Sequence, residues 1–319
     1  MTRQQQIRRA LNDWMLPGAI VLGITLYLVY HFTPALHPYG KWLHPMASEG
    51  QRLVVAVLLF FQFVKVSPHD LKISRWHLGA LLVQALSFLL LAGLAYLTKG
   101  NLRMLLECAM LCMICPTASA AGVITDKLGG QLAATVTYLV MINVAATFLL
   151  PLVIPLVNPS STLGFWAYVG HIAWKVFPIL ILPGLLAWLI RYTTHKLQRM
   201  LMRWASNSFY VWGVGLTLAL VLATRALLLS SPGPWGVAGI VLVSMACCAV
   251  QFLAGRRMGR GKAESITAGQ ALGQKNTGFL IWLGYNYLTP VTSVAGGLYA
   301  IWQNLFNSWE LYQKEHAKS

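Results

Sequence analysis

The chain has 319 residues, of which 57% are hydrophobic and only 10% are charged, and its formal net charge is +16. Soluble domains carry roughly 25% charged residues, so this composition excludes a soluble protein and indicates a polytopic membrane protein. It also argues against a nucleic-acid partner, because the basic residues lie in short loops between apolar segments, which is the pattern that orientation in a membrane requires.

The amino-terminal stretch, MTRQQQIRRALNDWM, lacks a signal-peptide cleavage pattern and leads directly into the first apolar segment. A membrane span needs about 20 apolar residues. Spans of this kind can be drawn near residues 17–35, 51–67, 76–98, 102–127, 131–157, 166–191, 204–229, 234–255, 264–284 and 288–311. We therefore predict an all-α polytopic membrane protein with ten transmembrane helices.

The distribution of basic residues tests this prediction. If the amino terminus is cytoplasmic, the inner loops and ends hold Arg3, Arg8, Arg9, Lys65, Lys72, Arg75, Lys127, Arg191, Lys196, Arg199, Arg203, Arg256, Arg257, Arg260, Lys262, Lys314 and Lys318. The outer side then holds only Lys41, Arg52, Lys99, Arg103 and Arg225. A missed span would exchange the sides of every later loop, so this bias favours ten spans with both termini cytoplasmic, in a cell (inner) membrane.

The predicted spans divide into two groups of five, residues 1–159 and residues 160–319. An odd number of spans in each half places similar halves in opposite orientations, which is an inverted repeat. The fourth span of each half is the one that small and polar residues interrupt. Paired interruptions of this kind indicate the midplane binding site of a transporter.

In the first half, the interruption follows Cys115. Pro116 has no backbone donor and clashes with the preceding turn, so the helix is expected to kink or unwind there. Thr117 and Ser119 can bond the freed backbone groups, and Gly122 permits close approach of another segment. Glu107 lies about two turns earlier and is either an interfacial carboxylate or a partner for a charge at the interruption.

In the second half, polar side chains gather at Gln270, Gln274, Lys275, Asn276 and Thr277. A lysine at mid-bilayer depth costs about 2.5–3.5 kcal/mol on insertion scales. The glycines at 269, 273 and 278 weaken the helix at the same depth, where irregular backbone is tolerated only against protein or a water-filled cavity. A charge and a broken helix at one level predict a binding site for a polar ligand.

These two segments resemble those of the bile acid:sodium symporter (BASS) family, and the chain is similar to a divergent prokaryotic member. Cys115-Pro116 followed by small residues resembles the family's first crossover segment. Gly273-Gln-Lys-Asn-Thr-Gly278 resembles its Gly-x-Gln-Asn-Ser/Thr-Gly segment, and the order of spans agrees over essentially the whole chain. The resemblance implies crossed, discontinuous helices 4 and 9. It also implies a core of helices 3–5 and 8–10 that moves against a panel of helices 1, 2, 6 and 7.

The chain departs from this family at its sodium sites. Ala121 and Gly122 stand where the family has a Ser-Asn pair, and Ala271 stands where it has a glutamate, so the oxygen ligands of one sodium ion are missing. The second site is similar only at Gln84, because Lys275 stands at its glutamine position. An ammonium repels sodium, but it can occupy similar space and bond the same carbonyl groups. We therefore predict that Lys275 substitutes for a sodium ion.

The resemblance implies a secondary active transporter of an organic anion, bile-acid-like or a small carboxylate, that works by alternating access without sodium. The alternatives are sodium coupling, proton coupling and a non-transporting receptor. Proton coupling would act through Lys275, because burial disfavours a charged ammonium. We expect no catalytic residues, metal or cofactor, because the few carboxylates are scattered and no Walker loop is present. The expected partners are the anion and the lipid bilayer, whereas the substrate's identity, the coupling ion, the transport direction and the oligomeric state stay open.

Overall fold

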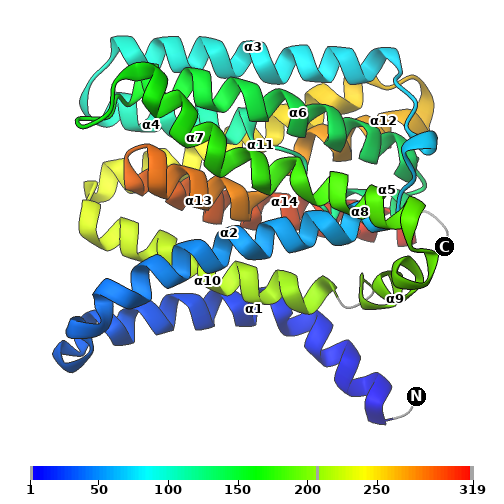
Figure 1. Cartoon of the computed structure of the whole chain (residues 1–319), viewed down its shortest axis with the longest axis horizontal. Coiled ribbons are helices and arrows are strands. Elements are labelled where there is room, and N and C mark those ends of the chain that lie inside the picture. Colours follow the sequence, from blue (N-terminus) through cyan, green and yellow to red (C-terminus); the bar gives the residue numbers. More distant parts are fainter. Residues whose placement is uncertain (1–2, 206–207, 317–319) are drawn as a thin grey trace.

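A computed structural model of the chain describes residues 3–205 and 208–316, which are almost entirely helical. The helices are α1 (Arg3–Phe32), α2 (Gly40–Val64), α3 (Arg75–Leu97), α4 (Gly100–Ile114), α5 (Ala121–Leu128), α6 (Leu132–Val157), α7 (Phe165–Leu180), α8 (Leu182–Thr193), α9 (His195–Ala205), α10 (Ser208–Ser230), α11 (Gly233–Met258), α12 (Gly261–Gly273), α13 (Thr277–Tyr287) and α14 (Ser293–His316). Short 3₁₀ turns lie at Pro34–Tyr39, Pro68–Asp70 and Pro290–Thr292. The helices run back and forth along the longest axis of the molecule (Figure 1).

Several of these helices are long and apolar enough to cross a membrane. Judged by length and composition, the candidate spans within the described residues are Pro34–Val64, Arg75–Leu97, Leu132–Val157, Phe165–Thr193, Tyr210–Ser230 and Gly233–Met258. A helix satisfies all its backbone groups internally, which is what a segment in lipid requires. The chain is therefore an all-α membrane protein, and this part of the sequence prediction is confirmed. The pieces α4, α5, α12 and α13 are each too short to span alone.

Two boundaries differ from the sequence prediction. The second predicted span begins near residue 51, whereas α2 begins at Gly40. The polar side chains of its first turns find partners: Ser48 bonds Asn286, and Glu49 pairs with Arg52. The segment between the sixth and seventh predicted spans also forms a helix of its own, α9, whose amphipathic sequence suits the surface of a membrane. Lys318, one of the predicted inner basic residues, lies outside the described residues.

The helices pack in two groups. In one, α10 packs against α1 and α2, and α2 also packs against α7, α8 and α9. In the other, α11 packs against α12, α4 and α14, while α3 packs against α4 and α6. Contacts of α10 with α13 and α14, of α2 with α13, and of α6 with α7 join the two groups. Both ends of the described chain lie at the same end of the long axis (Figure 1).

Glycine allows the close approach of α11 and α12. A Cβ atom on Gly255 would stand 2.3 Å from the carbonyl oxygen of Ala268, and one on Gly273 would stand 2.3 Å from the ring of Phe252. Contacts this short do not occur for real Cβ atoms, so both positions need glycine for the two helices to touch. Besides its predicted role in weakening the helix, Gly273 therefore allows α12 to pack closely against α11.

Candidate functional site

Two interrupted helices cross near the middle of the molecule. The first ends at Ile114 and resumes as α5 at Ala121, and the second ends at Gly273 and resumes as α13 at Thr277. The extended residues between them pair in antiparallel fashion at Thr117 and Lys275. The Ala118 amide donates to the Gln274 carbonyl oxygen at 3.0 Å, and the Asn276 amide donates to the Pro116 carbonyl oxygen at 2.8 Å. The interruptions that the sequence predicts at Cys115-Pro116 and near Lys275 are confirmed.

Side chains satisfy the carbonyl groups that the interruptions leave free. Thr117 Oγ1 donates to the Ala271 carbonyl oxygen at 2.7 Å, and Cys115 Sγ donates to that of Asn276 at 3.1 Å. Gln84 Nε2 donates to the Cys115 carbonyl oxygen at 2.9 Å. The amide of Gln84 is itself fixed, because Tyr138 donates its hydroxyl hydrogen to Gln84 Oε1 at 2.5 Å. Buried polar groups are costly unless they are bonded, so these contacts stabilise the crossing.

Helix α14 holds the backbone of Lys275 from the other side. Gln303 Oε1 accepts a hydrogen bond from the Lys275 amide at 2.8 Å, and Gln303 Nε2 donates to the Lys275 carbonyl oxygen at 3.3 Å. One turn before it along α14, Tyr299 donates its hydroxyl hydrogen to the Gly273 carbonyl oxygen at 2.8 Å. Helix α14 therefore holds the second interruption at its beginning and at its middle residue.

The side chain of Lys275 is fully buried. Its Nζ has no hydrogen-bond partner within the part of the chain that the structure describes. The titratable groups around it are the thiols of Cys115, Cys112, Cys248 and Cys247. The expectation that the ammonium bonds the carbonyl groups of the crossing is wrong for this structure, because Nζ makes no hydrogen bond to them; Gln84, Thr117, Cys115 and Tyr299 donate to them instead.

Glu107 is not the partner of Lys275. Its Oε1 accepts from Arg103 Nε at 2.9 Å, and its Oε2 accepts from the Thr289 amide at 3.1 Å. Arg103 also donates to the Val157 carbonyl oxygen at 2.6 Å. The prediction of a charge partner at the crossing is wrong because these groups satisfy both oxygens of the carboxylate. Glu107 is fully buried and bonds the segment after α13, while its partner Arg103 bonds the end of α6, so the carboxylate lies near the ends of several helices.

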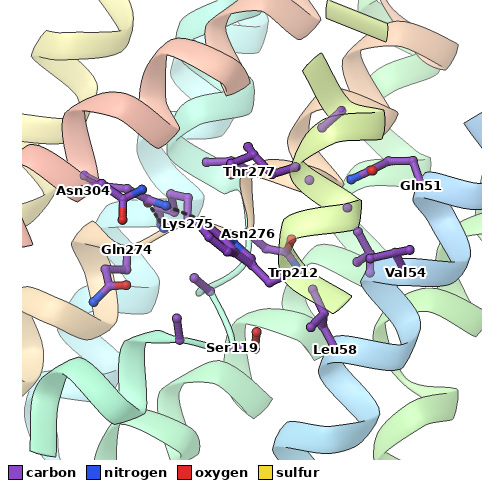
Figure 2. Close-up of a pocket in the computed structure, with 18 residues that line it drawn as sticks. Gln51, Val54, Leu58, Ser119, Trp212, Gln274, Lys275, Asn276, Thr277 and Asn304 are labelled. Atoms are coloured by element: carbon purple, nitrogen blue, oxygen red, sulfur yellow. Dashed lines mark hydrogen bonds between the residues drawn. The ribbon is translucent and has the colours of Figure 1, made fainter. Parts of the chain in front are cut away.

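A cavity lies beside the crossing, between the two groups of helices. Its internal space is about 70 Å³, and about 640 Å³ when the open solvent at its mouth is included. Apolar side chains of α2 and α10 form one wall, and the crossing and α14 form the other (Figure 2). The lining residues are Gln51, Val54, Val55, Leu58, Ala118, Ser119, Ala120, Trp212, Gly215, Leu216, Ala219, Gln274, Lys275, Asn276, Thr277, Gly278, Gln303 and Asn304. An apolar wall facing a few polar groups is the usual form of a small-molecule site.

The charges of the wall favour an anion. Among the described lining residues, Lys275 is the one with an ionisable side chain, and this side chain is fully buried rather than exposed to the cavity. The amino-terminal ends of α5 and α13 also border the cavity, because Ala120 directly precedes α5, and Thr277 and Gly278 begin α13. Asn276 caps α13, with its Oδ1 accepting from the Phe279 amide at 3.2 Å. Helix amino termini carry a partial positive charge, which adds to that of the lysine.

The predicted site residues divide between the cavity and its support. Ser119, Gln274, Lys275, Asn276 and Thr277 line the cavity. The others lie around the crossing or behind it: Gln84, Cys115, Pro116, Thr117, Ala121, Gly122, Gln270 and Gly273. Of these, Gly122 faces the amide of Gln62 and the side chains of α6, as expected for a position of close approach.

The sequence prediction missed the contribution of α14. Gln303, Asn307 and Glu310 are all buried and follow i, i+4, i+7 spacing, so they share one face of that helix. Gln303 and its neighbour Asn304 both line the cavity. Polar residues at helical spacing in a membrane segment usually face protein, and this signal could have identified the α14 residues from the sequence. Gln51 and Trp212, single residues on α2 and α10, carry no comparable pattern.

A scan of protein-family models and a search of curated proteins found no match for this chain. The argument for its function therefore depends on the geometry of the crossing and of the cavity.

Proposed function

We propose that the protein is a secondary active transporter of an organic anion, similar to the bile acid:sodium symporter family, and that it works by alternating access. The observation that carries this proposal is the pair of interrupted helices crossing at a buried lysine, beside a cavity between two helix groups. Discontinuous helices whose positive ends face a central cavity are the usual binding sites of secondary transporters.

The proposed architecture is an inverted repeat of residues 1–159 and 160–319, with ten crossings, both termini cytoplasmic and a location in the cell inner membrane. In this scheme α4 with α5 is the fourth crossing and α12 with α13 is the ninth, so each half has its interruption at the same place. The common position of the two chain ends supports an even number of crossings (Figure 1). The packing of α10 against α1 and α2, and of α2 against α7 and α8, supports a panel, which contacts the remaining helices through α7 with α6 and through α2 and α10 with α13.

In this proposal Lys275 supplies a tethered positive charge where the bile acid:sodium symporter family uses sodium. The ammonium is fully buried, and Cys112 and Cys115 at the carboxyl-terminal end of α4 are among the groups around it. A helix carboxyl terminus carries a partial negative charge that a cation stabilises. The ammonium acts through this field, since neutral donors already bond the carbonyl groups of the crossing.

The test is uptake of labelled organic anions, such as taurocholate and benzoate, by vesicles containing the purified protein, with and without sodium. We expect sodium-independent uptake that Lys275→Gln abolishes. Lys175→Gln is the matched control, because Lys175 is one-third exposed and pairs with Glu49 at 3.9 Å. Uptake that sodium stimulates would refute the substitution, and absence of both uptake and counterflow for every anion would refute the transporter.

A further inference from the structure

Helix α14 carries a carboxylate into the interior of the helix bundle. Glu310 is only 5% exposed and lies about two turns from Gln303, on the same face. One of its oxygens pairs with Arg256 of α11, and Oε2 accepts from Gln270 Nε2 of α12 at 2.6 Å. Ionisable groups in membrane segments are costly and mark functional sites. The transport mechanism proposed above assigns no role to Glu310.

A ladder of amide side chains joins Glu310 to the cavity at the crossing. Gln270 donates to Glu310 through Nε2 and accepts from Gln274 Nε2 through Oε1. Gln274 is the last member of the ladder, and it lines the cavity. Every hydrogen of the ladder points toward Glu310, as expected when its first member is an ionised carboxylate, which can only accept hydrogen bonds.

Glu310, at the other end of the ladder, borders a surface depression near the carboxyl-terminal end of α14. The depression encloses about 1230 Å³, including open space, and its other lining residues are Leu128, Arg256, Lys262, Ser265, Ile266, Trp309, Gln313 and Lys314. The charged groups that line this depression with Glu310 are Arg256 from α11, Lys262 from α12 and Lys314 from α14 itself. From α5, the carbonyl oxygen of Lys127 accepts from Lys314 Nζ at 2.8 Å. Water in this opening can reach the carboxylate.

Protonation of Glu310 would reverse the ladder. A neutral carboxyl group has a hydrogen to donate, and its best acceptor is the oxygen of Gln270. Rotation of the Gln270 amide then turns its nitrogen toward Gln274, and the Gln274 amide rotates in the same way. Before the change Gln274 Nε2 is held by Gln270; after it, that nitrogen faces the cavity as a donor. Ionised Glu310 therefore presents an amide oxygen to an anion, and protonated Glu310 presents an N–H group.

We propose that Glu310 is a proton-binding site linked through Gln270 and Gln274 to the anion site at the crossing. This inference rests on the proposed function for the identity of the second ligand. One proton from the water of the opening binds the carboxylate, the pair with Arg256 is released to solvent, and the affinity for the anion increases. Linkage is reciprocal, so anion binding also increases the affinity of Glu310 for the proton.

The first test needs no anion. Infrared difference spectra of the full-length protein between about pH 4 and about pH 9 record carboxyl protonation and side-chain amide bonding together. We expect a carboxylic C=O band and accompanying amide changes in the wild type. Glu310→Gln should lose both, and Gln270→Leu should keep the carboxyl band but lose the amide changes. Glu49→Gln, which alters a half-exposed carboxylate, is the matched control and should resemble the wild type.

The second test measures the affinity of the same proteins for taurocholate over this pH range. We expect the wild-type affinity to fall about five- to 150-fold from acid to alkaline pH, the usual range of coupling between two sites. Glu310→Gln should keep the high affinity throughout, and Gln270→Leu should be insensitive to pH. If Glu310→Gln leaves the infrared spectra unchanged, the inference is overturned whatever the protein transports. It is also overturned if the anion affinity of Gln270→Leu depends on pH. If the spectra behave as expected and no anion binds or is transported, the proposed function fails and the linkage to an anion site fails with it.

Discussion

Gln303→Leu tests how the second interruption is held. Gln303 is the side chain that bonds both the amide and the carbonyl group of Lys275, at 2.8 and 3.3 Å. Leucine fills a similar volume but leaves the buried Lys275 amide without a partner, whereas the Lys275 carbonyl oxygen keeps the hydrogen bond from the Thr277 amide at 2.9 Å. An unsatisfied buried group costs about 1–3 kcal/mol, so the free energy of unfolding should fall by about 1–3 kcal/mol.

Thermal unfolding of the purified protein measures this loss. A change of 1 kcal/mol shifts Tm by roughly 2–4 °C in chains of 150–250 residues, and somewhat less in a longer one. We therefore expect Tm to fall by roughly 2–6 °C. Asn304→Leu is the matched control, because Asn304 Nδ2 bonds the Ala300 carbonyl oxygen of its own helix at 2.6 Å. If Gln303→Leu and Asn304→Leu unfold at the same temperature, the α14 clamp does not stabilise the crossing.

Two further changes probe the frame around the site. Glu107→Gln removes the charge that pairs with Arg103. Because that arginine is one-third exposed, we expect the free energy of unfolding to fall by about 1–3 kcal/mol, measured as a lower Tm. An unchanged Tm would show that the pair does not stabilise the protein. Gly273→Ala places a Cβ 2.3 Å from the Phe252 ring and should cost about 1–3 kcal/mol by overpacking. Gly93→Ala, with nothing within 4 Å of the new Cβ, should be neutral or stabilising, and an equal Tm for the two alanine variants would contradict the packing role.

The sequence predicted the parts of the site that depend on local chemistry. Pro116 cannot continue a helix, and α4 ends two residues before it. The cluster around Lys275 could not lie in a continuous helix without exposing polar groups to lipid, and α12 ends at Gly273. These inferences needed no knowledge of which helices are neighbours. The pairing of the two interruptions came from their equivalent positions in the two halves, and the antiparallel bridge between Thr117 and Lys275 agrees with it.

The contacts between side chains of the folded protein were harder to predict from the sequence. Arg103 lies one turn before Glu107 in α4 and pairs with it. The spacing of four residues between them is visible in the sequence and favours this pair over a contact between Glu107 and Lys275. The shared face of Gln303, Asn307 and Glu310 becomes visible only when the polar residues of α14 are compared with the helical period.

The way the crossing is satisfied explains why an ammonium can occupy this position. An ion site in a broken helix uses carbonyl groups that the backbone leaves free, and in this chain neutral side chains bond those groups. Gln84 bonds Cys115, Thr117 bonds Ala271, and Tyr299 bonds Gly273. The crossing then has no need of a ligated ion to keep its shape. In the proposed function a positive charge there attracts the anion, and a tethered ammonium supplies it without an ion from solution. Glu310 at the far end of the amide ladder is the group through which we propose that protons act on the site.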